Sequence, residues 1–405
     1  MSYLFTDRVD FKGEAIDAFS RLKVSQPFTI FDSQHRYKPN EKFDTKTIGD
    51  AGISYSLNES AIHMQVGETA GDEVIRQSKY VFPYQPGKSL LILNTFAFDQ
   101  AKENLLQRVG YFNDYNGIFL ERNGLTAYMV LRSYVTGVTV ENRIEQSQWN
   151  GDVFDGSGPS GITLDTNKAN IFWTDIEWLG VGDVRTGFFI HGRPVVAHTF
   201  HNENVNPTTY MTTATLPVRL ELKNLANTGS TAMMRQICSS VISEGGYEGR
   251  AITNYVGSNA TTEINLGNEA GVPTPIAAIR LRSDRIDAVV VPADVQIVVT
   301  SNANVNWKLV LNPVLTGGTW VTFSDSSSVE YNKTITGVTG GTIIKEAYVS
   351  SNAVERISAP GEFIAQLGRT IDGVSDVLLL QVTPLVGTNT KIFANLGWQE
   401  LGGVR

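Results

Sequence analysis

The sequence predicts an all-β protein, and three observations point to that fold class. Charged residues make up 18% of the 405 residues, below the roughly 25% usual for globular domains, while glycine occurs 37 times. Short apolar runs rich in β-branched and aromatic residues recur along the chain, with turn-forming residues between them. Residues 14–22 and 99–109 could each form a short helix, and residues 234–242 fit a strand or a short helix equally well. At this length we expect two or three domains.

The first 40 residues predict an extended arm, because phenylalanines recur at intervals among charged residues. An arm of this kind would lie over its own chain or over a neighbouring subunit, and we expect it to serve assembly and to be ordered by contact with other subunits. The alternative is a strand that pairs with the main domain. The phenylalanines assigned to the arm are Phe5, Phe11, Phe19, Phe28 and Phe31.

Residues 41–247 predict a first β-sandwich, since strand follows strand with turn residues between. Asn123 and Gly124 supply the positive φ that a tight hairpin turn needs. The clearest hairpin spans 186–200, and Pro194 marks its return strand as an edge strand because proline cannot donate to a neighbouring strand.

A second β-sandwich is expected over residues 276–405. The stretch 248–275 is rich in glycine and asparagine, which is typical of a linker, and short strands resume beyond it. Chain reversals at Gly317 and Gly340 fit this reading. We therefore expect two β domains joined near residues 248–275.

Composition excludes several functional classes. The 33 basic and 41 acidic residues give a net charge of −8, whereas a nucleic-acid binder needs a basic face. The single cysteine, Cys238, excludes an intrachain disulfide and a cysteine-rich metal cluster. Residues 1–25 lack the features of a signal peptide, and no apolar run is long enough to span a bilayer. We expect no cofactor, no nucleic-acid partner and no membrane insertion.

Several stretches of the chain carry distinctive motifs. They are AFSRLKVSQPFTIFDSQHRY near the N-terminus, DVFDGSGPSGITLDTNKANIFWTDIEWLGVGDVRTGFFIHGRPVVAHTF in the middle, MRQICSSVISEGGY before the linker, and IAAIRLRSDRIDAVVVP followed by LNPVLTGGTW. Together they resemble virion structural proteins of tailed bacteriophages, particularly those infecting marine cyanobacteria. The resemblance implies a particle component whose first domain is a lectin-like (concanavalin-like) jelly roll, and it carries over no catalytic residue.

This resemblance sets the expected function, which is architectural. We expect a virion protein on the particle exterior, in the tail, fibre or baseplate or else as a decoration of the capsid surface. Its partners would be other virion proteins and further copies of itself, and a host surface glycan is the alternative partner. Assembly would take place in the host cytoplasm. The acidic net charge of −8 agrees with a protein that does not adhere to packaged DNA.

One strand has a pattern that resembles a catalytic strand of lectin-like glycoside hydrolases. Trp173, Asp175 and Glu177 alternate, so a strand would place them on one face. A retaining glycosidase needs two carboxyl groups about 5–5.5 Å apart across the sugar, and tryptophan stands where the nucleophile would be. The sequence therefore predicts a protein that is not an enzyme, with glycoside hydrolysis as the less favoured alternative.

Two sets of residues raise the question of a metal site. Asp152, Asp155 and Asp165 lie in a glycine-rich loop, but their spacing differs from a helix–loop–helix calcium site, which favours a plain loop. His198 and His201 lie three positions apart on an extended segment, and no third ligand lies near them in the sequence. We expect no metal.

Aromatic side chains support glycan binding as an alternative function, because tryptophan and tyrosine faces stack on sugar rings. Each of them is by itself more typical of core packing. The aromatics in the first domain that we consider are Trp149, Trp173, Trp178, Tyr111, Tyr115 and Tyr128. The glycan-contact residues that the sequence nominates are Trp173, Asp175, Glu177 and Trp178.

Overall fold

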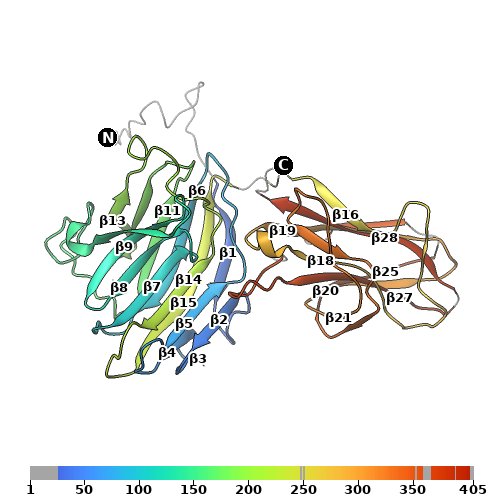
Figure 1. Ribbon diagram of the computed structural model, residues 1–405, viewed down its shortest axis with the longest axis horizontal. Coiled ribbons are helices and arrows are strands. Elements are labelled where there is room, and N and C mark those ends of the chain that lie inside the picture. Colours follow the sequence, from blue (N-terminus) through green and yellow to red (C-terminus); the bar gives the residue numbers. More distant parts are fainter. Residues whose placement is uncertain are drawn as a thin grey trace, which may run out of the picture.

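The protein consists of two β-sandwiches that lie side by side (Figure 1). The structure, a computed structural model, describes residues 26–246, 249, 251–351, 354–358, 366–387 and 389–401. In these ranges the regular elements are strands and two short 3₁₀ turns, η2 (Gln146–Gln148) and η3 (Ser283–Arg285). The described part of the chain forms no apolar helix of bilayer-spanning length. The all-β prediction, a jelly roll followed by a second sandwich, is confirmed.

The first sandwich is built from two antiparallel sheets. An eight-stranded sheet has the order β13-β12-β11-β6-β15-β4-β3 with β1 added beside β15, and a seven-stranded sheet has the order β10-β9-β8-β7-β14-β5-β2. The strands of the eight-stranded sheet are β1 (Phe28–Gln34), β3 (Ala51–Ser56), β4 (Ala61–Val66), β6 (Ser89–Ala97), β11 (Asn170–Ile176), β12 (Val184–Ile190), β13 (Arg193–Phe200) and β15 (Ala232–Glu244). Those of the seven-stranded sheet are β2 (Phe43–Ile48), β5 (Glu73–Ser78), β7 (Leu105–Phe112), β8 (Gly117–Asn123), β9 (Thr126–Ser133), β10 (Val140–Glu145) and β14 (Val218–Asn224).

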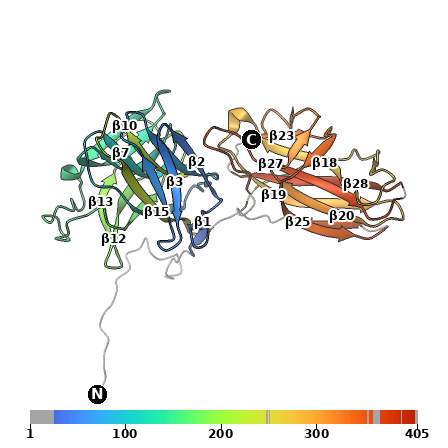
Figure 2. The same cartoon turned by 90° about the horizontal axis from the view of Figure 1, so that it is seen from below.

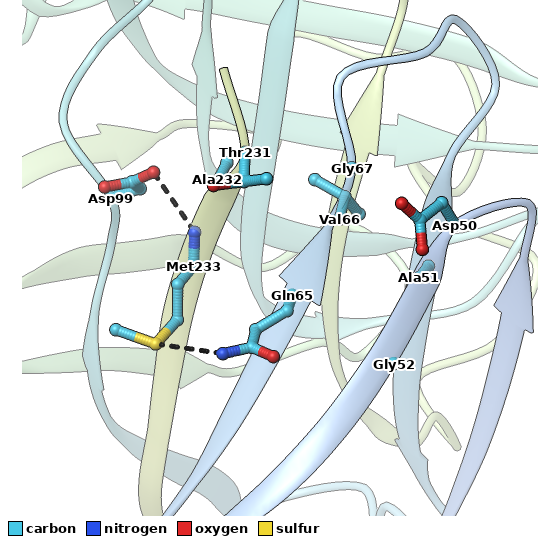
Figure 3. A pocket seen from close by; sticks show the side chains of 10 residues that line it. All are labelled: Asp50, Ala51, Gly52, Gln65, Val66, Gly67, Asp99, Thr231, Ala232 and Met233. Carbon is cyan, nitrogen blue, oxygen red and sulfur yellow. Dashed lines mark hydrogen bonds between the residues drawn. The ribbon is translucent and has the colours of Figure 1, made fainter.

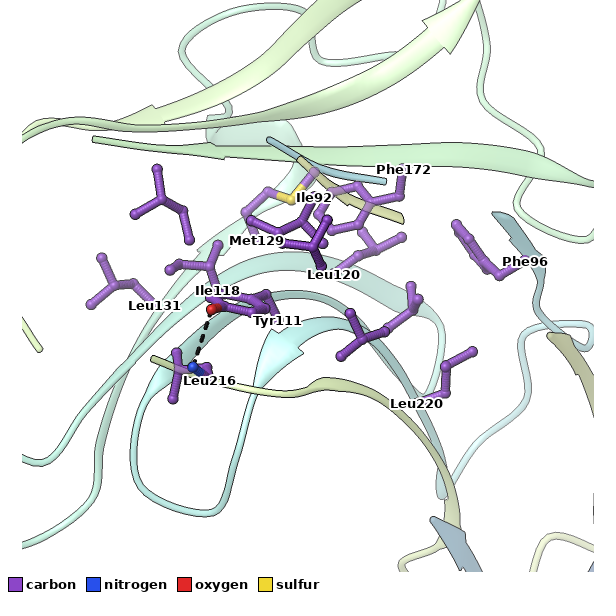
Figure 4. Close-up of a cluster of buried hydrophobic side chains, with 14 of the residues drawn as sticks. Ile92, Phe96, Tyr111, Ile118, Leu120, Met129, Leu131, Phe172, Leu216 and Leu220 are labelled. Carbon is purple, nitrogen blue, oxygen red and sulfur yellow. Dashed lines mark hydrogen bonds between the residues drawn. The ribbon is translucent and has the colours of Figure 1, made fainter. Parts of the chain in front are cut away.

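The core of the first sandwich fills the space between these sheets (Figure 4). Ile92 and Phe172 come from the eight-stranded sheet, while Leu120 comes from the other. Tyr111 is also fully buried, and its hydroxyl donates to the Ala214 carbonyl at 2.8 Å. Alternate residues of each strand point into this core, as the period of two requires.

Residues 28–34 belong to the jelly roll and not to a separate arm. Strand β1 pairs with β15, and Phe31 lies opposite Val241. Phe31 is 3% exposed and its ring centroid lies 4.8 Å from that of Phe82, whereas Phe28 is 39% exposed. The arm assignment is thus corrected for Phe28 and Phe31, because cross-strand pairing and core packing place this segment in the sheet. The remaining arm phenylalanines, Phe5, Phe11 and Phe19, lie outside the described residues.

The second sandwich contains a five-stranded sheet, a six-stranded sheet and a two-stranded ribbon. The five-stranded sheet has the order β16-β28-β19-β26 with β17 beside β28, and the six-stranded sheet has the order β22-β23-β18-β27-β20-β25. The strands of the first are β16 (Thr253–Gly257), β17 (Ile264–Asn265), β19 (Val289–Val299), β26 (Val354–Ser358) and β28 (Lys391–Leu401). The other strands are β18 (Thr274–Leu281), β20 (Val305–Leu311), β22 (Val321–Thr322), β23 (Val329–Asn332), β25 (Thr342–Val349) and β27 (Val377–Pro384), with β21 (Val314–Thr316) and β24 (Gly337–Thr339) in the ribbon.

Part of the expected linker is therefore structured. Strands β16 and β17 lie within residues 248–275 and pair with β28, which completes the five-stranded sheet. The buried Trp307 and Trp398 form the centre of the second core. A loop-like composition does not prevent pairing where a long neighbouring strand offers an unpaired edge.

The two sandwiches lie next to each other (Figure 2). A small apolar contact and several polar contacts join them. Val81, which follows β5, is buried against Val289, Val291 and Leu401 of the second sandwich. The Gln366 side-chain amide donates to the Val81 carbonyl at 3.1 Å. Lys46 and Asp44 of β2 add polar contacts with Asp372 and the Ile371 N–H, so the two units are joined at the β2 edge of the seven-stranded sheet.

Candidate functional site

The loop between β7 and β8, residues 113–116, is an exposed loop of the jelly roll that several hydrogen bonds hold in place. The Asn113 side-chain oxygen accepts hydrogen bonds from the backbone N–H groups of Tyr115 and Asn116, both at 2.8 Å. The Asn113 N–H in turn donates to the Asn116 carbonyl at 2.9 Å. An asparagine that bonds the backbone two residues on fixes such a turn locally.

Contacts with neighbouring segments hold this loop in place. Asn116 is buried; its amide nitrogen donates to the Thr212 hydroxyl at 2.6 Å, and its oxygen accepts the Thr212 N–H at 3.1 Å and the Tyr134 N–H at 3.2 Å. Arg132 on β9 donates to the Asn113 carbonyl at 2.6 Å. Each polar group of Asn116 thus has a partner, so the loop is rigid before any ligand arrives.

The loop presents an aromatic ring and a carboxylate side by side. Tyr115 is 53% exposed, and its ring packs edge-on against Tyr134 with centroids 4.9 Å apart. The neighbouring Asp114 side chain is exposed, and Arg219 on β14 holds its carboxylate. An accessible aromatic face beside fixed acceptors for hydroxyl groups is a suitable surface for a polyhydroxylated ligand such as a sugar.

A buried network of charges lies beneath this loop, on the face of the seven-stranded sheet turned away from the core. Arg108 Nε lies 2.7 Å from Glu121 Oε2, and Arg108 Nη1 lies 3.0 Å from Glu221 Oε2. Burial alone would raise the pKa of Glu221, but Arg219 and Arg108 outweigh it and hold the pKa of Glu221 below its usual value. Arg132 covers the rings of Phe112 and Phe119, with its guanidinium carbon 5.4 and 4.9 Å from their centroids.

The residues that the sequence nominated for glycan contact are mostly occupied in packing. Trp173 and Asp175 share one face of β11, as alternation predicts, and Glu177 follows the end of that strand. Trp173 is buried, and Asp175 pairs with Arg185. Trp178 is partly buried against the core, with its ring edge-on to Tyr84 at 5.7 Å. The structure does not bring these indoles into an open binding face.

Among the other aromatics that the sequence singled out, only Tyr115 is exposed. Trp149 and Tyr111 are buried in the core, and Tyr128 is half-buried beside Phe119. Sequence alone offered Tyr115 as one of six equivalent candidates, because exposure depends on which face of which sheet each ring occupies.

The acidic loop after η2 caps its own backbone. The Asp152 carboxylate accepts the N–H groups of Phe154 at 2.8 Å and Ser160 at 2.6 Å, and Asp155 accepts the N–H of Ser157 at 2.8 Å. This arrangement matches the plain loop that the sequence favoured.

The two nearby histidines have different surroundings. His198 is buried, and desolvation followed by the charge of His201 lowers its pKa to about 4. His201 is exposed, and its ligand atoms lie within 4.8 Å of those of Asp183 and Glu203. Glu203 lies only two positions after His201, and the sequence-based expectation overlooked it. Asp183 is 18 positions away along the chain and reaches His201 only through the β12–β13 hairpin.

A groove of about 570 Å³ lies on the eight-stranded sheet, at the ends of β3, β4 and β15 (Figure 3). Asp50 and Asp99 lie at its two sides, and the Asp99 carboxylate accepts the Met233 N–H at 3.1 Å. None of the residues that line this groove is aromatic. The groove therefore lacks the aromatic stacking surface that Tyr115 provides on the loop 113–116, which we call the Tyr115 loop.

Comparisons with known proteins give matches in structure only. No protein-family model and no curated protein sequence matches the chain. Similar solved structures include a family 16 glycoside hydrolase (GH16) from the mixed-linkage glucan locus of Bacteroides ovatus, with 10% identity over 52% of this chain and 99% of that chain and a TM-score of 0.36. The CBM2 module of the evolved Dit protein of Lactobacillus casei BL23 phage J-1 matches with 6% identity over 56% of this chain and 100% of that one, with a TM-score of 0.35. A legume lectin-like domain from Entamoeba histolytica matches with 11% identity over 52% and 96% of the two chains and a TM-score of 0.32.

One sequence-based expectation is overturned by these comparisons. Several of the similar structures are glycoside hydrolases, among them GH16 proteins from Bacteroides ovatus and Mycobacterium smegmatis. We therefore withdraw the expectation that the chain is not an enzyme.

Proposed function

We propose that this chain is an exterior structural protein of a tailed-phage virion, and that its lectin-like domain binds a surface glycan of the host. The observation that carries the glycan-binding part is the rigid loop 113–116, which presents Tyr115 and Asp114 together. Virion membership is supported by the sequence motifs that resemble phage structural proteins. The expected partners are other virion proteins and further copies of the chain.

Physical chemistry favours this loop as the contact surface. Tyr115 offers an apolar face at small entropic cost, because its ring already packs against Tyr134. The carboxylate of Asp114 accepts hydrogen bonds from hydroxyl groups and is oriented by Arg219. Little conformational entropy is lost on binding when the loop is already fixed by Asn113 and Asn116.

A binding assay with matched tyrosine variants tests the glycan part. The purified chain is titrated against surface polysaccharides from candidate host bacteria, and Tyr115→Ala is compared with Tyr37→Ala, a tyrosine that is also exposed. We expect Tyr115→Ala to weaken binding by about tenfold, equivalent to about 1.4 kcal/mol, and Tyr37→Ala to leave it unchanged. Equal affinity of the Tyr115→Ala variant and the wild type would refute this surface as the site. Release of reducing ends during the same incubation would assign hydrolysis in addition to binding.

Labelling of intact particles tests the virion part separately. Antibodies raised against the purified chain, detected by immunogold electron microscopy, are expected to decorate purified phage at the tail, fibre or baseplate, or else at the capsid surface. Particles that carry no label, together with no peptide of this chain in their mass spectrum, would contradict virion membership whatever the glycan assay shows.

A further inference from the structure

Three side chains suited to metal binding meet at one end of the jelly roll, apart from the Tyr115 loop. Asp183 precedes β12, and His201 and Glu203 follow β13. These strands pair with Val184 opposite Phe200, so the residues just beyond the pair become neighbours. One ligand atom from each of the three side chains lies within 4.8 Å of the other two, and His201 Nδ1 lies 3.0 Å from Asp183 Oδ2.

The charges of this cluster are unbalanced without a cation. One oxygen of the Asp183 carboxylate and one of the Glu203 carboxylate lie within 4.8 Å of each other. Two carboxylates this close repel each other unless a proton or a cation lies between them. With a neutral imidazole the three groups carry a charge of about −2, which one divalent cation cancels.

A second observation points to the same place. Tyr210 is 5% exposed, and its hydroxyl has no hydrogen-bond partner among the described residues. Tyr210 is joined to the segment that carries Asp183, because its N–H donates to the carbonyl of Gly180, three positions before Asp183, at 3.0 Å. The Asp183 Oδ1 atom is also buried and has no hydrogen-bond partner in the described part of the chain. Buried polar atoms without partners are costly, and a bound ion with its water would satisfy both.

The backbone around the cluster is already fixed. The Tyr210 N–H donates to the Gly180 carbonyl at 3.0 Å, and the Asn202 side-chain amide donates to the Gly182 carbonyl at 3.0 Å. These two bonds tie the segment that carries His201 and Glu203 to the segment that carries Asp183. A preorganised set of ligands lowers the entropic cost of binding.

We propose that Asp183, His201 and Glu203 bind a divalent transition-metal cation of the Zn²⁺ class. An imidazole nitrogen with two carboxylates is a ligand set that Zn²⁺ accepts, whereas Ca²⁺ prefers six to eight oxygen ligands. Three protein ligands leave a coordination position for water, and the Tyr210 hydroxyl is available as a hydrogen-bond partner for that water. None of the three ligands belongs to the loop 113–116, so this proposal does not rest on the proposed glycan surface.

Isothermal titration of the full-length, tag-free protein with ZnCl₂ tests the proposal, with CaCl₂ as the comparison cation. The variants are His201→Ala and Glu203→Gln, and the matched control is His191→Asn, which alters another exposed histidine and keeps a residue that tolerates its positive φ of 51°. We expect one Zn²⁺ per chain in the wild type and in His191→Asn, with affinity lowered by about tenfold or more in the other two variants. Circular dichroism confirms that each variant is folded.

Three outcomes would overturn the site. They are the absence of saturable Zn²⁺ binding by the wild type, equal affinity in His201→Ala, and tighter binding of Ca²⁺ than of Zn²⁺. The midpoint of thermal unfolding gives a second readout, because a ligand that binds only the folded state raises it. A Zn²⁺-dependent rise in the wild type that is absent in Glu203→Gln is expected.

Discussion

Arg219 and Asp114 connect the exposed loop to the buried charges of the seven-stranded sheet. Their Nη2 and Oδ1 atoms lie 2.9 Å apart, although the two side chains are 5% and 68% exposed. Arg219 also contacts Glu221 Oε1 at 2.5 Å, so one guanidinium serves a buried and an exposed carboxylate. The position of Asp114 is therefore set from beneath by the sheet.

Replacing Arg219 by Met is expected to destabilise the protein by about 3 kcal/mol, because Glu221 would remain buried with fewer opposite charges. Lys38→Met breaks the exposed pair with Glu41, whose side chains are 70% and 77% exposed, and is expected to cost less than about 1 kcal/mol. Urea unfolding followed by circular dichroism measures both changes. Equal losses of stability would show that the buried ion pairs of the seven-stranded sheet contribute no more to stability than an exposed ion pair.

Phe31→Ala tests the assignment of β1 to the jelly roll. Removing this buried ring should leave a cavity and cost about 3–5 kcal/mol in the free energy of unfolding. Phe28→Ala removes a partly exposed ring from the same strand, and we expect it to cost about 1 kcal/mol or less. A small effect in both variants, measured by urea unfolding, would mean that β1 contributes little to the core.

Stability is expected to fall as the pH falls from 6.5 towards 4, and His35 contributes to this loss. Burial, followed by the charge of Arg76, lowers the pKa of His35 from 6.5 to about 4. Between pH 4 and pH 6.5 the unfolded chain binds a proton at His35 that the folded protein does not bind. The contribution of neutral His35 to stability is therefore complete above pH 6.5 and is lost progressively as the pH falls towards 4. The full loss for one such histidine is about 3 kcal/mol.

The His35→Gln variant isolates this contribution. Its free energy of unfolding should run parallel to that of the wild type above pH 6.5 and fall less steeply between pH 6.5 and 4. If the two curves of unfolding free energy against pH also stay parallel between pH 6.5 and 4, then His35 takes up no proton on unfolding in this pH range.

Val81→Asp is expected to separate the two sandwiches while each stays folded. The new carboxylate would be buried among Val289, Val291 and Leu401, an apolar contact that cannot satisfy it. Small-angle X-ray scattering should show a larger radius of gyration, with the strand signal in circular dichroism retained. Leu125→Asp in the exposed β8–β9 turn is the control and should change neither. An unchanged radius in Val81→Asp would indicate that other contacts hold the units together.

The sequence alone determined those strands and turns whose formation depends on residues close together in the chain. The hairpin between β12 and β13 turns at His191 and Gly192, with φ of 51° and 76°, as two turn residues between apolar runs predict. Pro194 does lie on an edge strand, since β13 ends the eight-stranded sheet. The all-β class follows from many such local patterns.

Tertiary structure decided everything that depends on distant partners. Part of the segment 99–109, which has helix propensity, is the start of β7, because pairing with β8 and β14 outweighs that propensity. Strand β1 joins the sheet through β15, about two hundred residues away in the chain.

For the candidate sites too, the sequence supplies the residue types, and the tertiary structure decides which of them are exposed or lie together. The sequence contains Tyr115, Asp183 and His201 without indicating which of them is exposed or near another ligand. Exposure of Tyr115 depends on the loop contacts of Asn116, and the meeting of Asp183 with His201 depends on the pairing of two strands. Strand periodicity acts between residues two positions apart, whereas a binding site is assembled from segments that only the packed sheets bring together.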